Sequence, residues 1–204
     1  MAKILLLHGW LESAKSMRPI ANLLSEKHEV TALNLPKISE SLTRQAEWLF
    51  DYLAAVPEPF DVIAAHSMGC ALLLRALTRM DASPAKRILL CCPAYGRITH
   101  LQFLAARRKF CERVIRRLFP NADAATAANQ AYELTRNDWR VTGLPNCSIT
   151  VIAAQRDFLI RRKNIDALCS DLRIEPVIIP NVGHNWLYNS PERLVSFILS
   201  GIED

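Results

Sequence analysis

Long apolar runs are missing from this 204-residue sequence. The longest continuous ones, such as residues 4–7 and 88–92, fall far short of the roughly eighteen residues that a membrane-spanning helix needs. The first eight residues carry one lysine and a short apolar run with no small-residue cleavage site after it, unlike a secretory signal. We therefore expect no membrane span and a cytoplasmic protein.

Paired-cysteine motifs are missing as well. None of the six cysteines stands in a Cys-x-x-Cys pattern, and most lie in apolar or helical stretches, so we expect free, mostly buried thiols. The histidines show no i, i+4 pair and no nearby cysteine pair of the kind that zinc sites use, and we predict no metal site. No Gly/Ser-rich linker or repeat divides the chain, which indicates a single domain over residues 1–204.

Hydrophobic residues, by contrast, make up half of the chain, enough for a packed core. Near-continuous apolar runs, typical of strands covered on both faces, alternate with segments of helical period. Strands are expected at residues 3–7, 29–34, 62–66, 87–91, 148–153 and 175–179, and helices at residues 17–27, 42–56, 70–79, 165–172 and 191–199. This alternation predicts a three-layer α/β/α sandwich around a six-stranded parallel sheet.

The connection between the fourth and fifth strands is much longer than the others, and we expect residues 94–145 to form an inserted helical cap. Residues 97–117 hold seven basic residues against one acid, with apolar residues at roughly helical spacing, which predicts a basic, amphipathic cap helix. Its apolar stripe would cover an acyl pocket. Its basic face, including Arg107 and Arg108, would bind an acidic carrier protein, an anionic substrate tail or a lipid headgroup. A merely solvated helix face explains the same pattern.

A serine ends the third predicted strand, in Ala65-His66-Ser67-Met68-Gly69, directly before a helical run. A serine on so tight a turn presents its hydroxyl beyond the sheet, and small residues two before and two after it are needed because strand and helix nearly collide. The helix N-terminus adds free N–H groups and the positive end of a dipole. Ser67 is therefore a candidate nucleophile; an ordinary strand-to-helix turn with a capping serine is the alternative.

An acid and a histidine, Asp157 and His184, follow the fifth and sixth predicted strands. In open α/β sheets the site lies beyond the carboxyl ends of the strands, so we expect both side chains near Ser67. A histidine there takes the serine proton and passes it to a leaving group, while a carboxylate orients the ring. Asp166 and Asp171 compete for the acid role, but both fall on a helical pattern.

His8-Gly9-Trp10 follows the first predicted strand. The glycine permits an unusual turn, so that the backbone N–H groups of Trp10 and Met68 together would form an oxyanion hole for a carbonyl oxygen. A histidine in this place fixes its loop more often than it reacts. We expect substrate contacts from the residues around these turns, namely His8, Gly9, Leu11, His66 and Pro93, in addition to Arg107 and Arg108 of the cap.

Taken together, these motifs resemble those of the α/β-hydrolase superfamily, in particular its small, cofactor-free serine esterases with a His-Gly motif near the N-terminus. The resemblance covers nearly the whole chain and implies Ser67 as nucleophile, Asp157 as acid and His184 as base. It also implies a sheet without the first two strands of the family. Ala65 stands where the family usually has glycine and is still small. The expected function is hydrolysis of short to medium acyl esters or thioesters through an acyl-enzyme, without a cofactor.

Other functions stay open at this point. A hydrolase fold can also serve a non-catalytic binding protein, because fold alone does not give function, and the same triad serves cofactor-free lyases and carbon–carbon hydrolases. Nucleic acid is disfavoured as a partner, since no aromatic residues are interleaved with the basic cluster. The expected partner is a small-molecule ester or thioester, either free or attached to an acidic carrier protein.

Overall fold

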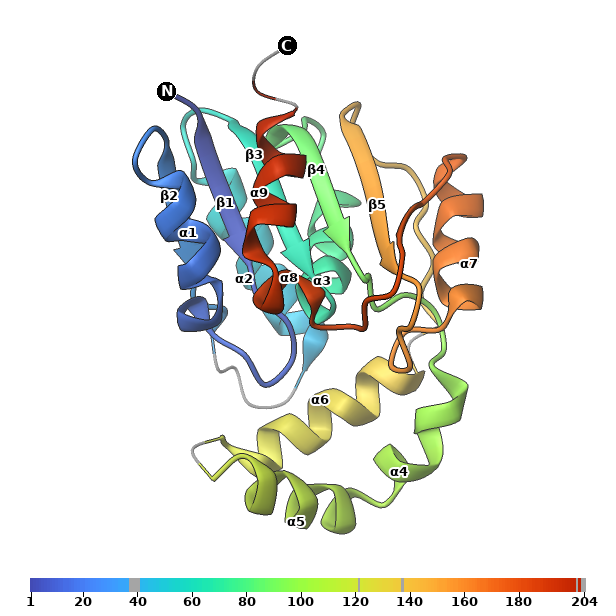
Figure 1. Ribbon diagram of the computed structural model, residues 1–204. Coiled ribbons are helices and arrows are strands. Elements are labelled where there is room, and N and C mark those ends of the chain that lie inside the picture. The colour runs from blue at the N-terminus through green and yellow to red at the C-terminus, as the bar shows by residue number, and fades with distance from the viewer. Residues whose placement is uncertain (37–40, 121, 137, 201, 203–204) are drawn as a thin grey trace.

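A computed structural model describes residues 1–36, 41–120, 122–136, 138–200 and 202 (Figure 1). Within them, six strands form one sheet: β1 (Lys3–Leu7), β2 (Glu29–Leu33), β3 (Phe60–His66), β4 (Ala85–Cys91), β5 (Ser148–Ala154) and β6 (Val177–Ile179). Their order is β2-β1-β3-β4-β5-β6, and every neighbouring pair is parallel. The predicted six-stranded parallel sheet is confirmed.

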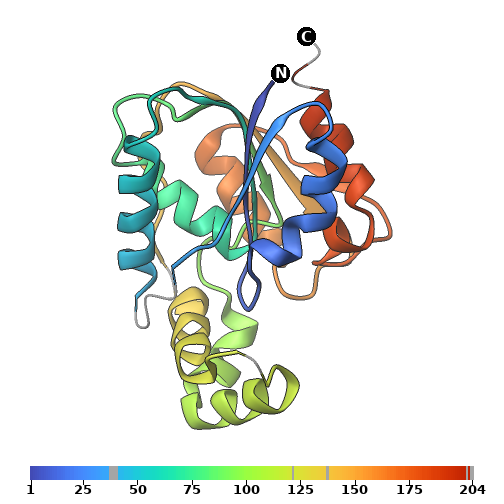
Figure 2. The ribbon, with the colours of Figure 1, turned by 90° about the vertical axis from the view of Figure 1, so that its left-hand side faces the viewer.

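Helices cover both faces of this sheet (Figures 1 and 2). One face carries α1 (Arg18–Leu24), which follows the 3-10 turn Ala14–Met17, together with α8 (Trp186–Asn189) and α9 (Pro191–Leu199). The other face carries α2 (Leu42–Ala54), α3 (Met68–Leu77) and α7 (Arg162–Leu172). Alternate residues of β1 enter different apolar cores: Leu5 and Leu7 one, Ile4 and Leu6 the other. The predicted three-layer sandwich is confirmed, and burial on both faces explains why the strands are continuously apolar.

Three helices between β4 and β5 lie beyond the carboxyl ends of the strands (Figure 1). They are α4 (Gln102–Ala106), α5 (Arg108–Leu118) and α6 (Ala124–Arg136), preceded by the 3-10 turn Thr99–Leu101, and we call them the cap helices. All of them fall within the predicted insertion, residues 94–145, of which 121 and 137 lie outside the described residues.

The prediction of one continuous helix across residues 97–117 is wrong. The backbone at Arg107 (φ −87°, ψ 63°) leaves the helical region, so that α4 ends before α5 begins. This break lets α4 and α5 both pack against α6. The cap core is small: Ile115 packs with the alanines of α6, against Trp10 and Leu11 from the loop after β1.

Two further expectations concern the chain as a whole. In the part of the chain that the structure describes, no helix combines the length and the apolar content that crossing a membrane requires. All six cysteines are free, and Cys70, Cys91, Cys92 and Cys169 are buried, as expected.

Candidate active site

Ser67 joins β3 to α3 with a backbone conformation that L-residues rarely adopt (φ 50°, ψ −111°). Its N–H donates to the carbonyl of Cys91 (2.9 Å) and its carbonyl accepts from the N–H of Ala94 (3.2 Å), so the turn is held by the end of β4. A Cβ on Gly69 would lie only 2.6 Å from the carbonyl oxygen of His8. The crowding expected at this strand-to-helix turn is therefore present, and the surrounding structure holds Ser67 in its strained conformation.

A hydrogen-bonded chain links Ser67, His184 and Asp157. His184 Nε2 lies 3.0 Å from Ser67 Oγ, and His184 Nδ1 lies 2.7 Å from Asp157 Oδ2. The second carboxylate oxygen, Asp157 Oδ1, accepts the backbone N–H groups of Leu159 (2.9 Å) and Ile160 (2.8 Å). With both its oxygens held, the buried carboxylate fixes the ring of His184 so that Nε2 points at the serine hydroxyl.

The loops that follow β5 and β6 bring Asp157 and His184 together. The N–H of Arg156 donates to the carbonyl of Val182 (2.9 Å), and the N–H of Asn181 donates to Gln155 Oε1 (2.9 Å). These bonds extend the pairing of β5 with β6 beyond the sheet. The acid and the histidine are therefore neighbours because their strands are neighbours.

The loop after β1 passes close beside Ser67. A Cβ on Gly9 would lie 3.3 Å from Ser67 Cβ and 2.9 Å from His66 Nδ1, so only glycine fits this approach. No described residue accepts a hydrogen bond from the backbone N–H of Trp10 or of Met68. Both N–H groups are therefore available as donors, and their role as an oxyanion hole stays a prediction.

His8 anchors this loop to the end of β2. Its Nε2 accepts the backbone N–H of Leu35 (3.2 Å), and its Nδ1 donates to the carbonyl of Gly9 (2.9 Å). A backbone N–H can only donate, so Nε2 carries no proton and the ring is neutral. Burial lowers the pKa of His8, and the hydrogen bond to Gly9 offsets this only in part. Both ring nitrogens are used in holding the loop.

A second buried cluster, which the sequence did not reveal, lies next to the triad. Glu12 Oε2 accepts the N–H of Gly9 (2.7 Å) and the hydroxyl of Tyr188, and it lies 3.3 Å from His66 Nδ1. His66 Nε2 lies 3.2 Å from the carbonyl oxygen of His184, to which it donates. One carboxylate thus connects the loop after β1 with the loop that carries His184.

The carboxylate of Glu12 stays ionised in this cluster. Burial would raise the pKa of Glu12, but the hydrogen bonds from His66, Tyr188 and Gly9 outweigh burial and hold that pKa below its ordinary value. Burial also raises the pKa of Tyr188, and the neighbouring Glu12 charge adds to the effect. Tyr188 therefore keeps its proton and donates it.

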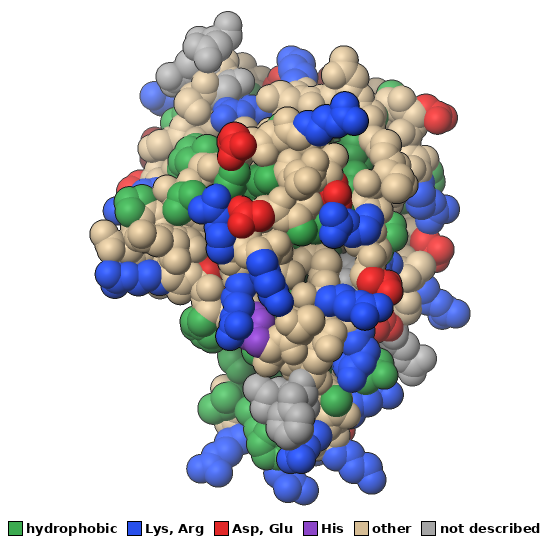
Figure 3. Space-filling model, turned by 90° about the vertical axis from the view of Figure 1, so that its right-hand side faces the viewer, with side chains coloured by type: hydrophobic (Ala, Val, Ile, Leu, Met, Phe, Trp, Pro, Cys, Tyr) green, Lys and Arg blue, Asp and Glu red, His purple; other side chains and the backbone are tan. Residues whose placement is uncertain are grey.

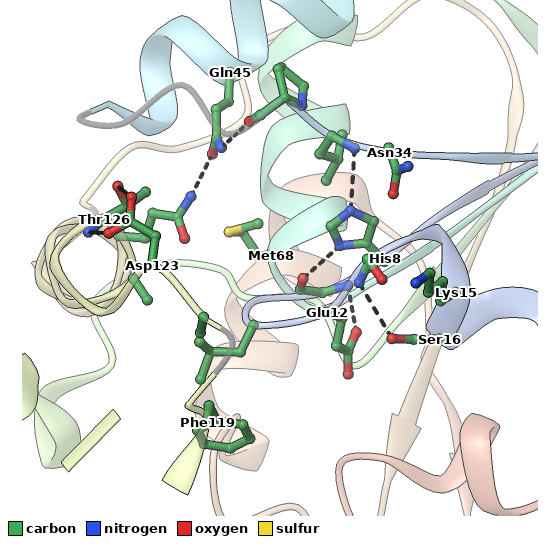
Figure 4. A pocket seen from close by; sticks show the side chains of 18 of the residues that line it. His8, Glu12, Lys15, Ser16, Asn34, Gln45, Met68, Phe119, Asp123 and Thr126 are labelled. Carbon is green, nitrogen blue, oxygen red and sulfur yellow. Dashed lines mark hydrogen bonds between the residues drawn. The ribbon is translucent and has the colours of Figure 1, made fainter. Parts of the chain in front are cut away.

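A cavity of about 900 Å³ opens between the loop after β1, the N-terminal half of α2 and the cap helices (Figure 4). Of the residues expected to contact substrate, His8, Gly9 and Leu11 line it, together with Met68, one of the two expected oxyanion donors. Ser67 itself is not among the described residues that line the cavity, but its neighbours Gly9 and Met68 are.

The other expected substrate contacts lie elsewhere. His66 is buried with both ring nitrogens facing Glu12, Tyr188 and the His184 carbonyl, so it is part of the second cluster. Pro93 is buried behind the Ser67 turn. Arg107 and Arg108 are exposed where α5 begins. None of these four is among the described residues that line the cavity, and their contact with substrate stays a prediction.

One group of possible metal ligands occurs in the described part of the chain: His66, Cys92 and His184, whose ligand atoms lie within 4.8 Å of one another. Each nitrogen of the two rings already faces another partner in the site. Burial, followed by the charge of Asp157, raises the pKa of the Cys92 thiol well above its ordinary value. A thiol that keeps its proton is a poor metal ligand, so the donor set does not suit a metal ion.

Comparison with known proteins assigns the chain to a family. Residues 4–197 match the model of the alpha/beta hydrolase family. The chain belongs to this family. Its curated relative, the uncharacterized hydrolase YugF of Bacillus subtilis (strain 168), is 29% identical over 103 residues, which are 46% of this chain. The match spans only 37% of the length of that relative.

Solved structures of similar fold include two hydrolases of different kinds. A thermophilic esterase from Thermogutta terrifontis has a TM-score of 0.72 at 16% identity, with 100% of this alpha/beta hydrolase and 90% of that chain covered. The type II thioesterase BorB, from the borrelidin biosynthetic cluster, has a TM-score of 0.73 at 18% identity, with 98% and 90% covered. At these identities the similarity establishes the fold that the two proteins share with this chain.

Proposed function

We propose that this alpha/beta hydrolase is a serine hydrolase that cleaves carboxylic esters or thioesters of short to medium acyl groups. The observation that carries the proposal is the chain of contacts from Ser67 Oγ to His184 Nε2 (3.0 Å) and from His184 Nδ1 to Asp157 Oδ2 (2.7 Å). Three loops from three different strands deliver these side chains to one point. A nucleophile, a base within reach of it and a group that orients the base are the parts that acyl transfer needs.

In the first half of the reaction, His184 Nε2 takes the proton of Ser67 as Oγ bonds to the acyl carbon. The carbonyl electrons move onto the oxygen, which the N–H groups of Trp10 and Met68 stabilise. Loss of one such donor typically costs about 10² to 10³ in rate. When the tetrahedral centre collapses, the bond to the leaving oxygen or sulfur breaks and His184 gives that atom its proton, which leaves acyl-Ser67.

In the second half, water replaces the alcohol or thiol. His184 takes a proton from the water as its oxygen attacks the acyl carbon, and the collapse of that intermediate releases the carboxylic acid and returns the proton to Ser67 Oγ. Asp157 remains ionised throughout and stabilises the imidazolium that forms in each half.

Covalent labelling and turnover test the proposal together. Wild type should react with a fluorophosphonate probe at Ser67 and hydrolyse members of a chain-length series of 4-nitrophenyl esters and acyl thioesters, whereas Ser67→Ala should do neither. Full turnover by Ser67→Ala contradicts the proposal. Absence of both labelling and turnover in wild type favours a non-catalytic binding protein. Labelling with products other than acid and alcohol or thiol indicates a lyase or a carbon–carbon hydrolase.

An acyl thioester on an acidic carrier protein is a second form of substrate that a specific observation favours. Every basic residue of α5 is exposed, and the one acid of that helix, Glu112, is paired with Arg116. The cavity reaches the end of this helix, because Leu118 and Phe119 line it. A negatively charged carrier that binds α5 would therefore hold its acyl group beside the cavity.

Comparison of one acyl group in free and carrier-bound form tests this. The double variant Arg107→Glu/Arg108→Glu should lower kcat/KM for the carrier-bound thioester about tenfold or more, since like charges now face each other, and should leave the free thioester unchanged. Lys27→Glu/Arg193→Glu, with the same change of charge at exposed sites in the turn after α1 and on α9, serves as the control. Equal effects on both substrates argue against carrier binding at α5.

A further inference from the structure

We infer that the acyl part of the substrate carries a neutral amide or hydroxyl group and lies in the cavity between α2 and α6, hydrogen-bonded to Gln45 and Gln130. The inference rests on the proposed function and names the class of acyl group that the site accepts. A plain alkyl chain, which an apolar stripe over the pocket would favour, fits this cavity less well.

The side of the triad on which the cavity lies decides which part of the substrate enters it. His184 gives its proton to the leaving atom, so the leaving group faces His184, on the β6 side of Ser67. The described residues that line the cavity come from the loops after β1 and β2, from α2, from Met68 and from the cap, and none comes from the loops after β5 and β6. The cavity therefore lies on the opposite side of Ser67 and takes the acyl group.

A pair of buried carboxamides forms part of the polar lining of this cavity. Gln45 on α2 is 2% exposed and Gln130 on α6 is 9% exposed. Gln130 Nε2 donates to Gln45 Oε1 (3.3 Å), and Gln45 Nε2 donates to the carbonyl of Pro36 (2.9 Å). The pair thus links the cap to the main domain.

This pair has hydrogen-bonding capacity left over. Each carboxamide nitrogen carries two hydrogens, of which one is used, and Gln130 Oε1 accepts no hydrogen bond from any described residue. A ligand that supplies both a donor and an acceptor can use this spare capacity and gains hydrogen bonds by binding there. An amide or a hydroxyl supplies both, whereas an alkyl group supplies neither.

The charges of the cavity favour a neutral group over an acidic one. Two carboxylates, Glu12 and Asp123, and one ammonium, Lys15, line it. Asp123 accepts the N–H (3.1 Å) and the hydroxyl (2.8 Å) of Thr126 at the start of α6. Met68 lies between Gln45 and His8 (Figure 4) and offers an apolar surface for a short alkyl segment between the ester and the polar group.

Two activated esters of equal shape test the inference. 4-Nitrophenyl N-acetyl-β-alaninate carries an amide, and 4-nitrophenyl 5-methylhexanoate replaces that amide by hydrocarbon. Wild type should prefer the amide ester by about tenfold or more in kcat/KM, because a site with unpaired polar groups rejects an analogue that lacks the partner. Gln45→Met and Gln130→Met, each close to isosteric, should abolish or reverse this preference.

Labelling of Ser67 by the fluorophosphonate shows that a variant is folded; should Gln45→Met fail this check, Gln130→Met decides. Gln102→Met is the matched control, because Gln102 belongs to the cap but does not line the cavity. A wild type that hydrolyses both esters and prefers the alkyl one overturns the inference and leaves the proposed function standing. So does an unchanged preference in both glutamine variants. A wild type that neither labels nor turns over either ester overturns both.

Discussion

One carboxylate oxygen, Glu12 Oε2, serves two loops of the site at once. It accepts the N–H of Gly9 in the loop that carries Trp10, and it faces His66, which holds the carbonyl of His184. Glu12 touches none of the reacting groups of the proposed mechanism. In that mechanism it is a positioning residue, which keeps the proposed oxyanion donors and the proposed base in register.

We predict that Glu12→Gln lowers kcat while KM changes little. Glutamine keeps the shape but not the charge, and hydrogen bonds to charged groups are worth about 1.5–3 kcal/mol, equivalent to a loss of about 10- to 100-fold. Steady-state kinetics on an activated ester measure the effect, with Glu26→Gln, an exposed change in the turn after α1, as control. A wild-type kcat in Glu12→Gln would contradict a positioning role for Glu12.

We also predict that Gly69→Ala is damaging both to stability and to activity. The new Cβ would meet the carbonyl oxygens of His8 at 2.6 Å and Leu7 at 3.1 Å, so the loop after β1 must move away from Ser67. Overpacking of this kind typically costs about 1–3 kcal/mol, measurable by urea unfolding, and displaced oxyanion donors should lower kcat at least about tenfold.

Gly183→Ala is the matched control for Gly69→Ala, because the nearest atom to its Cβ, the carbonyl oxygen of Arg156, is 3.8 Å away. Equal losses in the two variants would show that crowding at the Ser67 turn is not the cause.

At the scale of elements, His8 joins the end of β1 to the chain that leaves β2. Its buried, neutral ring accepts the N–H of Leu35 and cannot do so once Nε2 is protonated. Because the folded pKa lies below the ordinary value of 6.5, the unfolded chain binds this proton more readily than the folded one. The contribution of His8 to stability is complete above about pH 6.5 and falls as the pH drops toward the lowered folded pKa.

The free energy of unfolding of the wild type should therefore decrease on acidification below about pH 6.5, by at most about 1.4 kcal/mol per pH unit from this one group. His8→Gln, which cannot titrate, should show a shallower dependence between about pH 5 and 7. Urea unfolding at a series of pH values measures this, with His28→Gln as control. Parallel pH curves for wild type and His8→Gln would contradict the assignment.

Most ends of the strands could be predicted from the sequence to within two residues, because strands buried on both faces are continuously apolar. The helix α6 was not predicted, and three of the residues buried on it, Thr126, Gln130 and Thr135, are polar, which weakens its apolar stripe. Nor does the break between α4 and α5 have a local signal, because Arg107 is neither glycine nor proline. Packing of both helices on α6 determines that break.

The residues of the site also fall into those that could be predicted from the sequence and those that could not. Ser67, Asp157 and His184 could be proposed because each follows its own strand and parallel strands end at one edge. Glu12 and Tyr188 could not, since they are 176 residues apart and no motif joins them. Gln45 and Gln130 meet only because the cap folds over α2, a contact that no helical period indicates.

At the scale of the molecule, the net charge of +5 is unevenly distributed. Lys and Arg side chains lie over much of one face and also at the cap end of the molecule (Figure 3), and α5 presents Lys109, Arg113 and Arg117 to solvent. Exposed apolar side chains, Phe110, Val114 and Leu118, recur along one edge of the same helix. Charge attracts an acidic partner from a distance, and the apolar edge offers contact area once it has arrived.

Turnover of a carrier-bound acyl group should therefore be strongly salt-dependent. Raising the ionic strength from about 0.05 M to 0.5 M shortens the screening length severalfold, and kcat/KM for the carrier-bound substrate should fall about tenfold or more, while the free thioester is unaffected. In Arg113→Gln/Arg117→Gln the salt dependence should be flatter. Stopped-flow or steady-state assays at several salt concentrations measure both, and equal salt curves for the free and carrier-bound substrates would contradict charge steering.

Trp10 has two attachments that belong to different parts of the molecule. Its backbone follows Gly9, which lies close to Ser67, and its indole donates to the carbonyl of Ala127 on α6 (3.0 Å). Chimeras that exchange the cap for one from another hydrolase would therefore also exchange the anchor of a proposed oxyanion donor. Such chimeras should be designed with residue 10 and helix α6 transferred as one unit. Otherwise we expect the chimera to gain the new specificity but to have a lower kcat.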